Sequence, residues 1–361
     1  MIKQTNFTIR KFDPSDIDGI IALLNHVFKP KFTRDWWKWK YELNPNGFWG
    51  QDGDIWVAES NDRIIGHYAV LPEKIKYYSK VVDMAQSVDT AVHPDYRGLG
   101  IFSMLARKVY SDAKSRYSFL LGFPSEMAHG GFLKLGWKDL SSLQEHTKIL
   151  NYNALIGRKF KNPLYAMSGK IFLKTYCRLT EISKTFSPRI IRGNEAEIDK
   201  VESFPAEIGA FWDQNREYYS VVLERTSLFL NWRFSKIFGE YQIFIGRSKK
   251  NKKILGYIVL RKAANTLDVI DLISLPNEDK ALLQLIDVAI ETGTNAGVDS
   301  LRCLFPKWHK TTAILAKKGF ISPKPLRFRG KYIPQFIYYN LTGKDSPVNE
   351  WFYTYADTDY V

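Results

Sequence analysis

The chain has 361 residues, which is long enough for two domains. Its residues are 45% hydrophobic and 25% charged, a composition that excludes a disordered protein. No apolar run is long enough to cross a membrane, the N-terminus lacks the apolar core of a signal peptide, and Cys177 and Cys303 have no metal or redox spacing. We therefore expect a cytoplasmic protein with no metal site. The net charge of +14 leaves nucleic acid, an anionic membrane surface or an anionic cofactor open as partners.

The first distinctive segment is residues 36–41, in which aromatic residues are interleaved with lysines. Such rings either stack on a bound sugar or bury against a sheet, and we favour packing in the core. Aromatic rings with lysines also bind single-stranded nucleic acid. No separate nucleic-acid motif accompanies the segment, so we expect no nucleic-acid partner.

A strand, a loop and a helix are predicted in succession from residue 85 onward. Residues 85–92 have the apolar and β-branched content of a buried strand. A helix is predicted to begin near Ile101, because apolar residues recur at helical spacing behind the loop: Phe102, Leu105, Ala106 and Val109. The loop between carries Arg97 and two glycines. Unpaired N–H groups at a helix N-terminus, together with the helix dipole, favour an anion, so we predict that the loop holds a phosphate or pyrophosphate.

The loop sequence resembles a known motif. Residues 92–101, Val-His-Pro-Asp-Tyr-Arg-Gly-Leu-Gly-Ile, are similar to the coenzyme A pyrophosphate loop of the GNAT superfamily of N-acetyltransferases. In that superfamily the next strand is followed by an Asn, an Ala three residues later, a Tyr four residues further on, and then Gly-Phe. Here the predicted strand at residues 117–123 is followed at the same intervals by Ser125, Ala128, Phe132 and Gly136-Trp137. The two motifs in register support the resemblance.

The resemblance implies which residues hold acetyl-CoA. The pantetheine arm is expected alongside the strand that ends at Val92, with its amides paired to the backbone, and main-chain N–H groups of the loop are expected to hold the pyrophosphate. The donor-binding residues are then Val92, Arg97, Gly98, Leu99, Gly100, Ile101 and Phe102. Phe102 departs from the family pattern, which has Gly or Ala there. We expect its ring to point into the core and cofactor binding to survive.

Three residues are candidates for acid–base chemistry. Where many relatives carry a Tyr that protonates the thiolate, this chain has Phe132, which cannot donate a proton. His129, one turn earlier, is the nearest titratable group, and Ser125 at the asparagine position is able to hydrogen-bond. Asp89 is a candidate base only if a β-bulge turns it toward the cleft, because alternation puts it on the strand face opposite Gln86.

Two further histidines leave the base unassigned. His67 and His93 are candidates with no better support than Asp89, and deprotonation of the acceptor amine through water is another route. Asp271 stands at the position of Asp89 in a second copy of the pattern, which favours a structural role for both.

That second copy lies 182 to 193 residues further along the chain. The matching pairs are Trp39 and Trp232, Gly66 and Gly256, Pro94 and Pro276, and Gly136 and Gly319. A duplicated domain gives such offsets; chance similarity of amphipathic elements is the alternative. We predict the α/β class, with two tandem GNAT-like domains, each a mixed, mainly antiparallel sheet flanked by helices. Residues 1–149 form the first domain, with the acetyl-CoA site, and residues 201–361 the degenerate second domain and tail.

The second copy lacks the features of the anion loop. Residues 275–282 contain no glycine, so the backbone is not expected to approach a pyrophosphate closely. Glu278 and Asp279 place two negative charges where a phosphate would lie. We interpret the second domain as a non-binding partner that shapes the substrate cleft.

Residues 150–200 are predicted to be a basic helical linker or insertion. Nine basic residues lie between Arg158 and Arg192 against one acid, Glu181. Residues 164–182 place an apolar stripe opposite Lys170, Lys174 and Arg178, as in an amphipathic helix. This helix either packs across both domains or rests on an anionic membrane surface.

The resemblance predicts an acetyl-CoA-dependent N-acyltransferase with a small amine acceptor. Residues 351–361 resemble the ends of tandem GNAT proteins from surface-polysaccharide gene clusters, which suggests an amino sugar or a nucleotide-linked sugar. Two alternatives stay open. Peptidoglycan-type aminoacyltransferases are tandem GNAT folds that use charged tRNA, which the positive charge fits and the intact loop does not. A catalytically inactive GNAT binding module fits Phe132 and the unassigned base.

Overall fold

The computed structural model describes residues 6–28, 31–47, 54–142, 144–152, 154, 196–235, 240–322, 335–343 and 350–358. The helix predicted at residues 164–182 lies outside the described residues, as does Cys177. The chain divides into two compact units, each assembled from three stretches of sequence. Unit 1 comprises Met1–Ser142, Tyr219–Phe238 and Tyr332–Trp351; unit 2 comprises Leu143–Tyr218, Gly239–Lys331 and Phe352–Val361.

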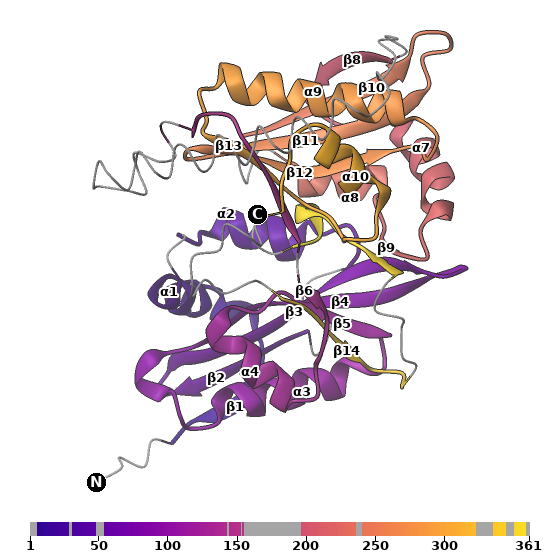
Figure 1. Cartoon of the computed structure of the whole chain (residues 1–361). Helices are drawn as coiled ribbons and strands as arrows, with labels where there is room; N and C mark the ends of the chain where they lie inside the picture. The colour runs from indigo at the N-terminus through magenta and orange to yellow at the C-terminus, as the bar shows by residue number, and fades with distance from the viewer. Residues whose placement is uncertain are drawn as a thin grey trace. The chain divides into compact units, whose positions relative to one another are not determined.

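Unit 1 is built on a nine-stranded mixed sheet (Figure 1). Its main order is β1-β2-β3-β4-β5-β14-β6, with β9 pairing β3 and β15 pairing β9. The strands are β1 (Thr8–Lys11), β2 (Ile55–Ser60), β3 (Arg63–Tyr77), β4 (Lys80–Val92), β5 (Phe119–Gly122), β6 (Lys138–Ser142), β9 (Val221–Leu223), β14 (Gln335–Asn340) and β15 (Trp351–Phe352). The helices are α1 (Ile17–Val27), α2 (Arg34–Trp37), which continues as a π-helical turn at Lys38–Glu42, α3 (Ile101–Ala113), α4 (Glu126–Lys134) and α8 (Ser227–Arg233).

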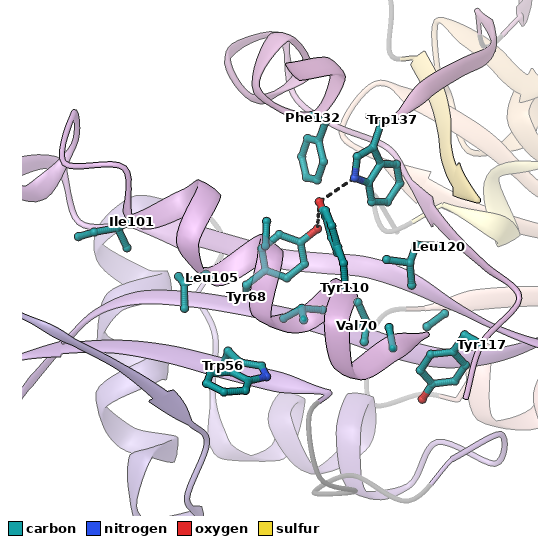
Figure 2. Close-up of a cluster of buried hydrophobic side chains, with 14 of the residues drawn as sticks. Trp56, Tyr68, Val70, Ile101, Leu105, Tyr110, Tyr117, Leu120, Phe132 and Trp137 are labelled. Carbon is teal, nitrogen blue, oxygen red and sulfur yellow. Dashed lines mark hydrogen bonds between the residues drawn. The ribbon is translucent and has the colours of Figure 1, made fainter. Parts of the chain in front are cut away.

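Helices α3 and α4 cover one face of this sheet. Residues of α3 that recur at helical spacing, among them Leu105, Val109 and Tyr110, are buried in one hydrophobic cluster with Tyr68 of β3 and Phe132 of α4 (Figure 2). Burial of each large side chain contributes roughly 1.5–3 kcal/mol. The helix predicted near Ile101 is thus confirmed, and its apolar side is what fixes the loop before it against the sheet.

Helices α1 and α2 lie on the opposite face. Successive β3 residues point to opposite faces, so His67 points away from Tyr68, and its ring centroid lies 6.4 Å from that of Trp37 in α2. The aromatic-basic segment is buried here: Trp37 is 1% and Tyr41 3% exposed. Trp39 and Trp232 stack with centroids 4.9 Å apart, and each indole N–H donates to the other's carbonyl at 2.8 Å. The segment therefore packs in the core, as predicted from the sequence.

Unit 2 contains a six-stranded mixed sheet in the order β7-β13-β12-β11-β10-β8. Its strands are β7 (Glu145–Ile149), β8 (Ala196–Val201), β10 (Tyr241–Ser248), β11 (Ile254–Ala263), β12 (Thr266–Ser274) and β13 (Ser300–Leu304). Its helices are α7 (Ile208–Asn215), α9 (Asp279–Asn295) and α10 (Lys310–Lys317). Among the described strands of unit 2 only β12 and β13 pair in parallel, as only β4 and β5 do along the main order of unit 1.

Each sheet includes at least one strand from the other half of the sequence, and one such strand occupies a matching place in both. In unit 1, β14 inserts between β5 and β6, antiparallel to both. In unit 2, β7 pairs antiparallel with β13, and Ile321 forms a bridge to Thr147 on the other side of β7. Strands at matching places in the two sheets are therefore exchanged between the halves of the chain.

The predicted fold class is confirmed, because the chain forms two mixed, mainly antiparallel sheets flanked by helices. The domain limits at residues 149 and 201 stay a prediction. The compact units cross those limits, since β14 belongs with unit 1 and β7 with unit 2.

Candidate functional site

The loop between β4 and α3 presents a row of backbone donors. Among the described residues, none accepts a hydrogen bond from the N–H groups of residues 98–103; the first helical bond runs from Met104 to the Gly100 carbonyl at 3.0 Å. Six consecutive donors at the start of a 13-residue helix leave a concentrated positive potential. This is a local geometry for binding an anion.

The two glycines are required by the shape of this loop. Gly98 and Gly100 have φ of +82° and +77°, where other residues are strained, and a Cβ on either would meet nothing within 4 Å. The backbone is therefore open to a ligand. Arg97 beside them is exposed, and no described carboxylate pairs with it. These residues fit the phosphates of a nucleotide cofactor.

The predicted donor-binding residues come together around this loop. Val92 ends β4, Leu99 is 37% exposed, and Ile101 is buried at the first turn of α3. Phe102 points into the core as predicted: its ring lies 5.2 Å from that of Phe132.

The two departures from the family pattern pack against each other. A Cβ on Gly131 would lie 3.0 Å from Phe102 Cε1, so the glycine leaves room for the larger ring. Phe132 is 5% exposed, and its ring also lies 5.1 Å from that of Trp137. Phe102, Gly131 and Phe132 thus form one packed group in which the usual Tyr hydroxyl is absent.

Strands β4 and β5 diverge next to the loop. They pair only through Ala85 with Leu120 and Gln86 with Leu121. In the described part of the chain no strand pairs with that edge of β4 from Ser87 to Val92. An extended ligand is able to pair with backbone groups along this open edge, as an added strand does.

The bulge that Asp89 needs is present in β4. His67 pairs with Ala91 and Ala69 with Val88, so Asp89 and Thr90 together oppose Tyr68 alone. Asp89 adopts a φ of +51°, which is uncommon for a residue other than glycine.

The carboxylate of Asp89 is held by the π-helical turn. Lys40 Nζ lies 3.0 and 2.9 Å from its two oxygens, and the Tyr41 hydroxyl donates to Oδ2 at 2.5 Å. Both side chains of the Lys40–Asp89 pair are almost fully buried. Asp89 therefore ties this turn to the bulge, and its role as a base stays a prediction.

His67 lies against the same bulge. Its Nδ1–H donates to the Asp89 carbonyl at 2.8 Å, which fixes the tautomer, and its Nε2 has no partner among the described residues. Burial lowers the pKa of the ring. His67 is fully buried.

The other histidine of the β4 end, His93, is also fixed. Its Nε2 accepts from Arg63 Nη2 at 2.9 Å, and its ring stacks on that of His26 with centroids 4.5 Å apart. Burial, then the charges of Arg63 and the neighbouring His26, lowers the pKa of His93. The structure gives His93 a role in anchoring the strand end beside the loop.

His129 lies in α4 and Ser125 directly before it, on the opposite side of the sheet from the partners of Asp89. His129 Nε2 lies 2.7 Å from Asp139 Oδ1, a contact that orients the ring. Ser125 is exposed and is the first residue before α4; its carbonyl accepts from the N–H of Ala128 and of His129, both at 3.0 Å. The three predicted catalytic residues are thus not gathered at one point.

A hydrogen-bonded chain that the sequence did not indicate crosses the α3 face of the sheet. Trp137 Nε1 donates to the Tyr110 hydroxyl at 2.7 Å, and the Tyr110 and Tyr68 hydroxyls lie 3.1 Å apart (Figure 2). Ser87 Oγ donates to the Tyr68 hydroxyl at 2.9 Å. The residues that each of these hydrogen bonds joins are 19 to 42 positions apart in sequence. The pattern of apolar and β-branched residues predicts the strands and helices that carry these side chains, but not the hydrogen bonds between them.

A sheet that opens beside a glycine-containing loop at a helix N-terminus is found in the fold of GNAT proteins. Residues 8–138 match the family model for the acetyltransferase (GNAT) domain. No curated protein matches the sequence.

Solved structures resemble nearly the whole chain. A conserved protein of unknown function from Enterococcus faecalis V583, described as a probable N-acyltransferase, is 14% identical with a TM-score of 0.64, covering 93% of this chain and 73% of its own. A GCN5-related N-acetyltransferase from Anabaena variabilis ATCC 29413 is 13% identical with a TM-score of 0.63 and the same coverage. Another from Kribbella flavida is 13% identical with a TM-score of 0.56, covering 92% of this chain and 71% of its own. At these identities the likeness shows the fold.

The described residues include neither a metal-binding cluster nor a membrane-spanning helix. They contain no group of three or more His, Cys, Asp or Glu side chains placed to hold a metal ion. None of their helices combines the length and the apolar character that a membrane span needs.

Proposed function

We propose that the chain is an acetyl-CoA-dependent N-acyltransferase with a small amine acceptor. The observation that carries this proposal is the row of six unpartnered N–H groups at residues 98–103, beside Arg97 and two open glycines. A pyrophosphate satisfies such donors, and the match of residues 8–138 to the acetyltransferase domain supports this choice of ligand.

Val92, Arg97 and the backbone from Gly98 to Phe102 are the residues that hold the donor in this proposal. The open edge of β4 from Ser87 to Val92 orients the pantetheine arm by backbone pairing. The bound donor supplies an activated acyl group. The protein then contributes mainly by holding both reactants in line, an effect that contributes roughly 7–11 kcal/mol in well-oriented systems.

We propose an amino sugar or a nucleotide-linked amino sugar as the acceptor, on the resemblance of residues 351–361 to proteins of surface-polysaccharide clusters. Asp89, Ser125 and His129 remain the proposed groups for handling protons. Asp139 keeps the ring of His129 oriented, which suits a general acid or base. A cytoplasmic location and the absence of a nucleic-acid partner are part of the same proposal.

The test is to measure acetyl-CoA and CoA binding to the full chain by calorimetry and by the shift in Tm. A ligand at 100 times its Kd stabilises the protein by about 2.7 kcal/mol, so a clear rise in Tm is expected. Candidate amino sugars, free and nucleotide-linked, are then incubated with acetyl-CoA while free thiol is measured.

Three outcomes separate the alternatives. Acetyl-CoA binding with thiol release by one acceptor supports the proposal. Acetyl-CoA binding without release by any amine indicates an inactive binding module. Absence of acetyl-CoA binding, with tRNA binding that weakens steeply as salt rises, indicates the aminoacyl-tRNA alternative.

A further inference from the structure

The two halves of the chain exchange strands in a reciprocal way. We call the described residues up to 154 the first half and those from 196 onward the second half. In unit 1, β14 of the second half lies between β5 and β6 of the first half (Figure 1). In unit 2, β7 of the first half lies between β13 and Ile321 of the second half. Since β6 and Ile321 follow the matching residues Gly136 and Gly319, each half gives the strand at this place and receives its counterpart.

The aromatic contact between the halves is reciprocal as well. Trp39 of the first half and Trp232 of the second are matching residues of the repeat, and both are at most 8% exposed. Their rings lie 12° from parallel, and each indole N–H donates to the carbonyl of the other residue. Equivalent residues contact each other in this way across the two-fold axis of a symmetric dimer. The contact therefore has the form of an interface between two copies of one domain.

The segments that the second half contributes to unit 1 are apolar and buried. β9 pairs antiparallel with the end of β3 through three residues that are at most 5% exposed: Val221, Val222 and Leu223. Three residues of β14 are at most 3% exposed: Phe336, Ile337 and Tyr338. Obligate interfaces bury apolar surface of this kind, and an added strand also gains main-chain hydrogen bonds. Non-covalent contacts thus join the two halves in addition to the chain that links them.

β14 also bears on the opening beside the donor loop. All four residues of β5, Phe119–Gly122, pair with β14, whereas only Leu120 and Leu121 pair with β4. The Tyr339 ring of β14 stacks on that of Tyr110 in α3, with centroids 4.8 Å apart. β14 therefore contacts both the strand that diverges from β4 and the helix that begins at the loop. Without β14, β5 would keep β4 as its sole strand neighbour in the described part of the chain.

We infer that the second half acts toward the first as a partner subunit, which docks through these contacts and completes the donor site by lending β14. The chain between Ala154 and Ala196 links the two partners, and the docking does not depend on it. The partner that fits the surface formed by β5, β6 and α2 is thus a second half of the same kind, paired as in a strand-exchanged dimer. The part of this inference that concerns donor binding rests on the proposed function, and the docking does not.

The experiment places the recognition sequence of a specific protease between Ala154 and Ala196 of the full chain and cuts the folded protein. We expect the two fragments to co-elute as one complex in gel filtration and to bind acetyl-CoA with the Kd of the uncut protein. Ile337→Ala then weakens the interface, because Ile337 of β14 is fully buried between strands of the first half. We expect the Kd between the cut fragments to rise by about tenfold or more.

Ile258→Ala is the matched control. Ile258 is also fully buried, but it lies on β11, between β10 and β12 of the second half. This variant is expected to leave the Kd between the fragments nearly unchanged. On dilution, the cut Ile337→Ala protein is expected to lose acetyl-CoA binding as its fragments separate, whereas the uncut variant keeps it.

The outcomes distinguish this inference from the proposed function. Separation of the wild-type fragments on cutting, without denaturant, would overturn the inference, as would equal effects of the two isoleucine variants on the Kd between fragments. Acetyl-CoA binding that persists in the separated first fragment would show that the donor site does not need β14. If the uncut wild-type protein does not bind acetyl-CoA, the proposed function fails, while co-elution of the fragments still supports the docking.

Discussion

The N-termini of α3 and α9 follow corresponding strands in the two sheets, yet they differ in what they leave open. At α3 the backbone N–H groups of residues 98–103 have no acceptor among the described residues, and Gly98 and Gly100 keep the approach clear. At α9 the helix begins with Asp279, whose Oδ1 lies 3.1 Å from Lys310 Nζ, and Lys310 also donates to the Pro276 carbonyl. One helix start is available to an external anion, and the other is neutralised by the protein's own side chains.

The comparison separates what the fold needs from what a ligand needs. α9 packs as well as α3, with Ala281, Leu282 and Leu285 buried, although its loop has no glycine. The glycines before α3 are therefore not required to turn a strand into this helix. A bulge is likewise present in both units: Ile270 is the extra residue beside Asp271, as Asp89 and Thr90 oppose Tyr68 in β4. The fold keeps the bulge, and only unit 1 keeps the open loop.

The largest effect is expected from closing that loop. Gly100→Val places a β-branched residue at a φ of +77° and puts methyl groups in front of the N–H groups. We expect loss of measurable acetyl-CoA binding by calorimetry. The matched control is Gly297→Val, since Gly297 also has a positive φ of +65° and nothing within 4 Å, but lies beyond α9 in unit 2. Equal loss of binding in both variants would mean that backbone strain alone explains the result.

Acid is expected to destabilise unit 2 independently of the loop. Burial of His146 on β7 lowers its pKa from 6.5 to about 4. Between these values the unfolded chain takes up a proton that the folded chain does not, so the free energy of unfolding falls as pH drops from 6.5 to 4. The loss approaches about 3 kcal/mol at pH 4.

His146→Gln removes this titration. Chemical denaturation at several pH values is expected to show a shallower acid loss for the variant than for the wild type. Its acetyl-CoA affinity at neutral pH is expected to match that of the wild type, because His146 belongs to unit 2 and the loop to unit 1. A parallel loss of stability in both proteins would show that other groups govern the acid response.

A smaller effect is expected from the charge at the loop. Arg97→Ala removes an exposed cation beside the N–H groups but leaves the backbone unchanged. We expect roughly tenfold weaker acetyl-CoA binding at low salt, and a smaller difference at high salt because screening shortens the reach of the charge. Arg107→Ala, which removes an exposed cation further along α3, is the control and is expected to change the Kd little.

The sequence predicted those parts of the site that depend on near neighbours in the chain. Local periodicity and two glycines predict three elements: the strand ending at Val92, the loop and the helix from Ile101. The structure contains all three. The second motif was also local: α4 runs Glu126–Lys134 and carries Phe132 on its buried side. Side-chain periodicity predicts which face of a helix or strand is buried, and this was enough to place Phe102 in the core.

Contacts between distant residues were not predictable in this way. Lys40 and Tyr41 reach Asp89 across 49 and 48 residues, respectively, and alternation along β4 did not reveal the bulge that brings them together. The exchange of β7 and β14 between the sheets depends on which of several antiparallel pairings is chosen, and the apolar pattern of a strand does not specify its neighbour. The hydrogen bonds that join Trp137, Tyr110, Tyr68 and Ser87 likewise emerge only when all four side chains are placed.

The last prediction asks whether the acids or the missing glycines make the start of α9 unsuitable for an anion. The variant Glu278→Gln with Asp279→Asn removes both negative charges and leaves the loop backbone as it is. Since Lys310 still donates to the Pro276 carbonyl and the loop still lacks a residue of positive φ, we expect no second site. Calorimetry is expected to give one acetyl-CoA per chain with an unchanged Kd. A second equivalent in the variant, absent from the wild type, would mean that charge and not backbone geometry distinguishes the two helices, and the argument from Gly98 and Gly100 would then lose its basis.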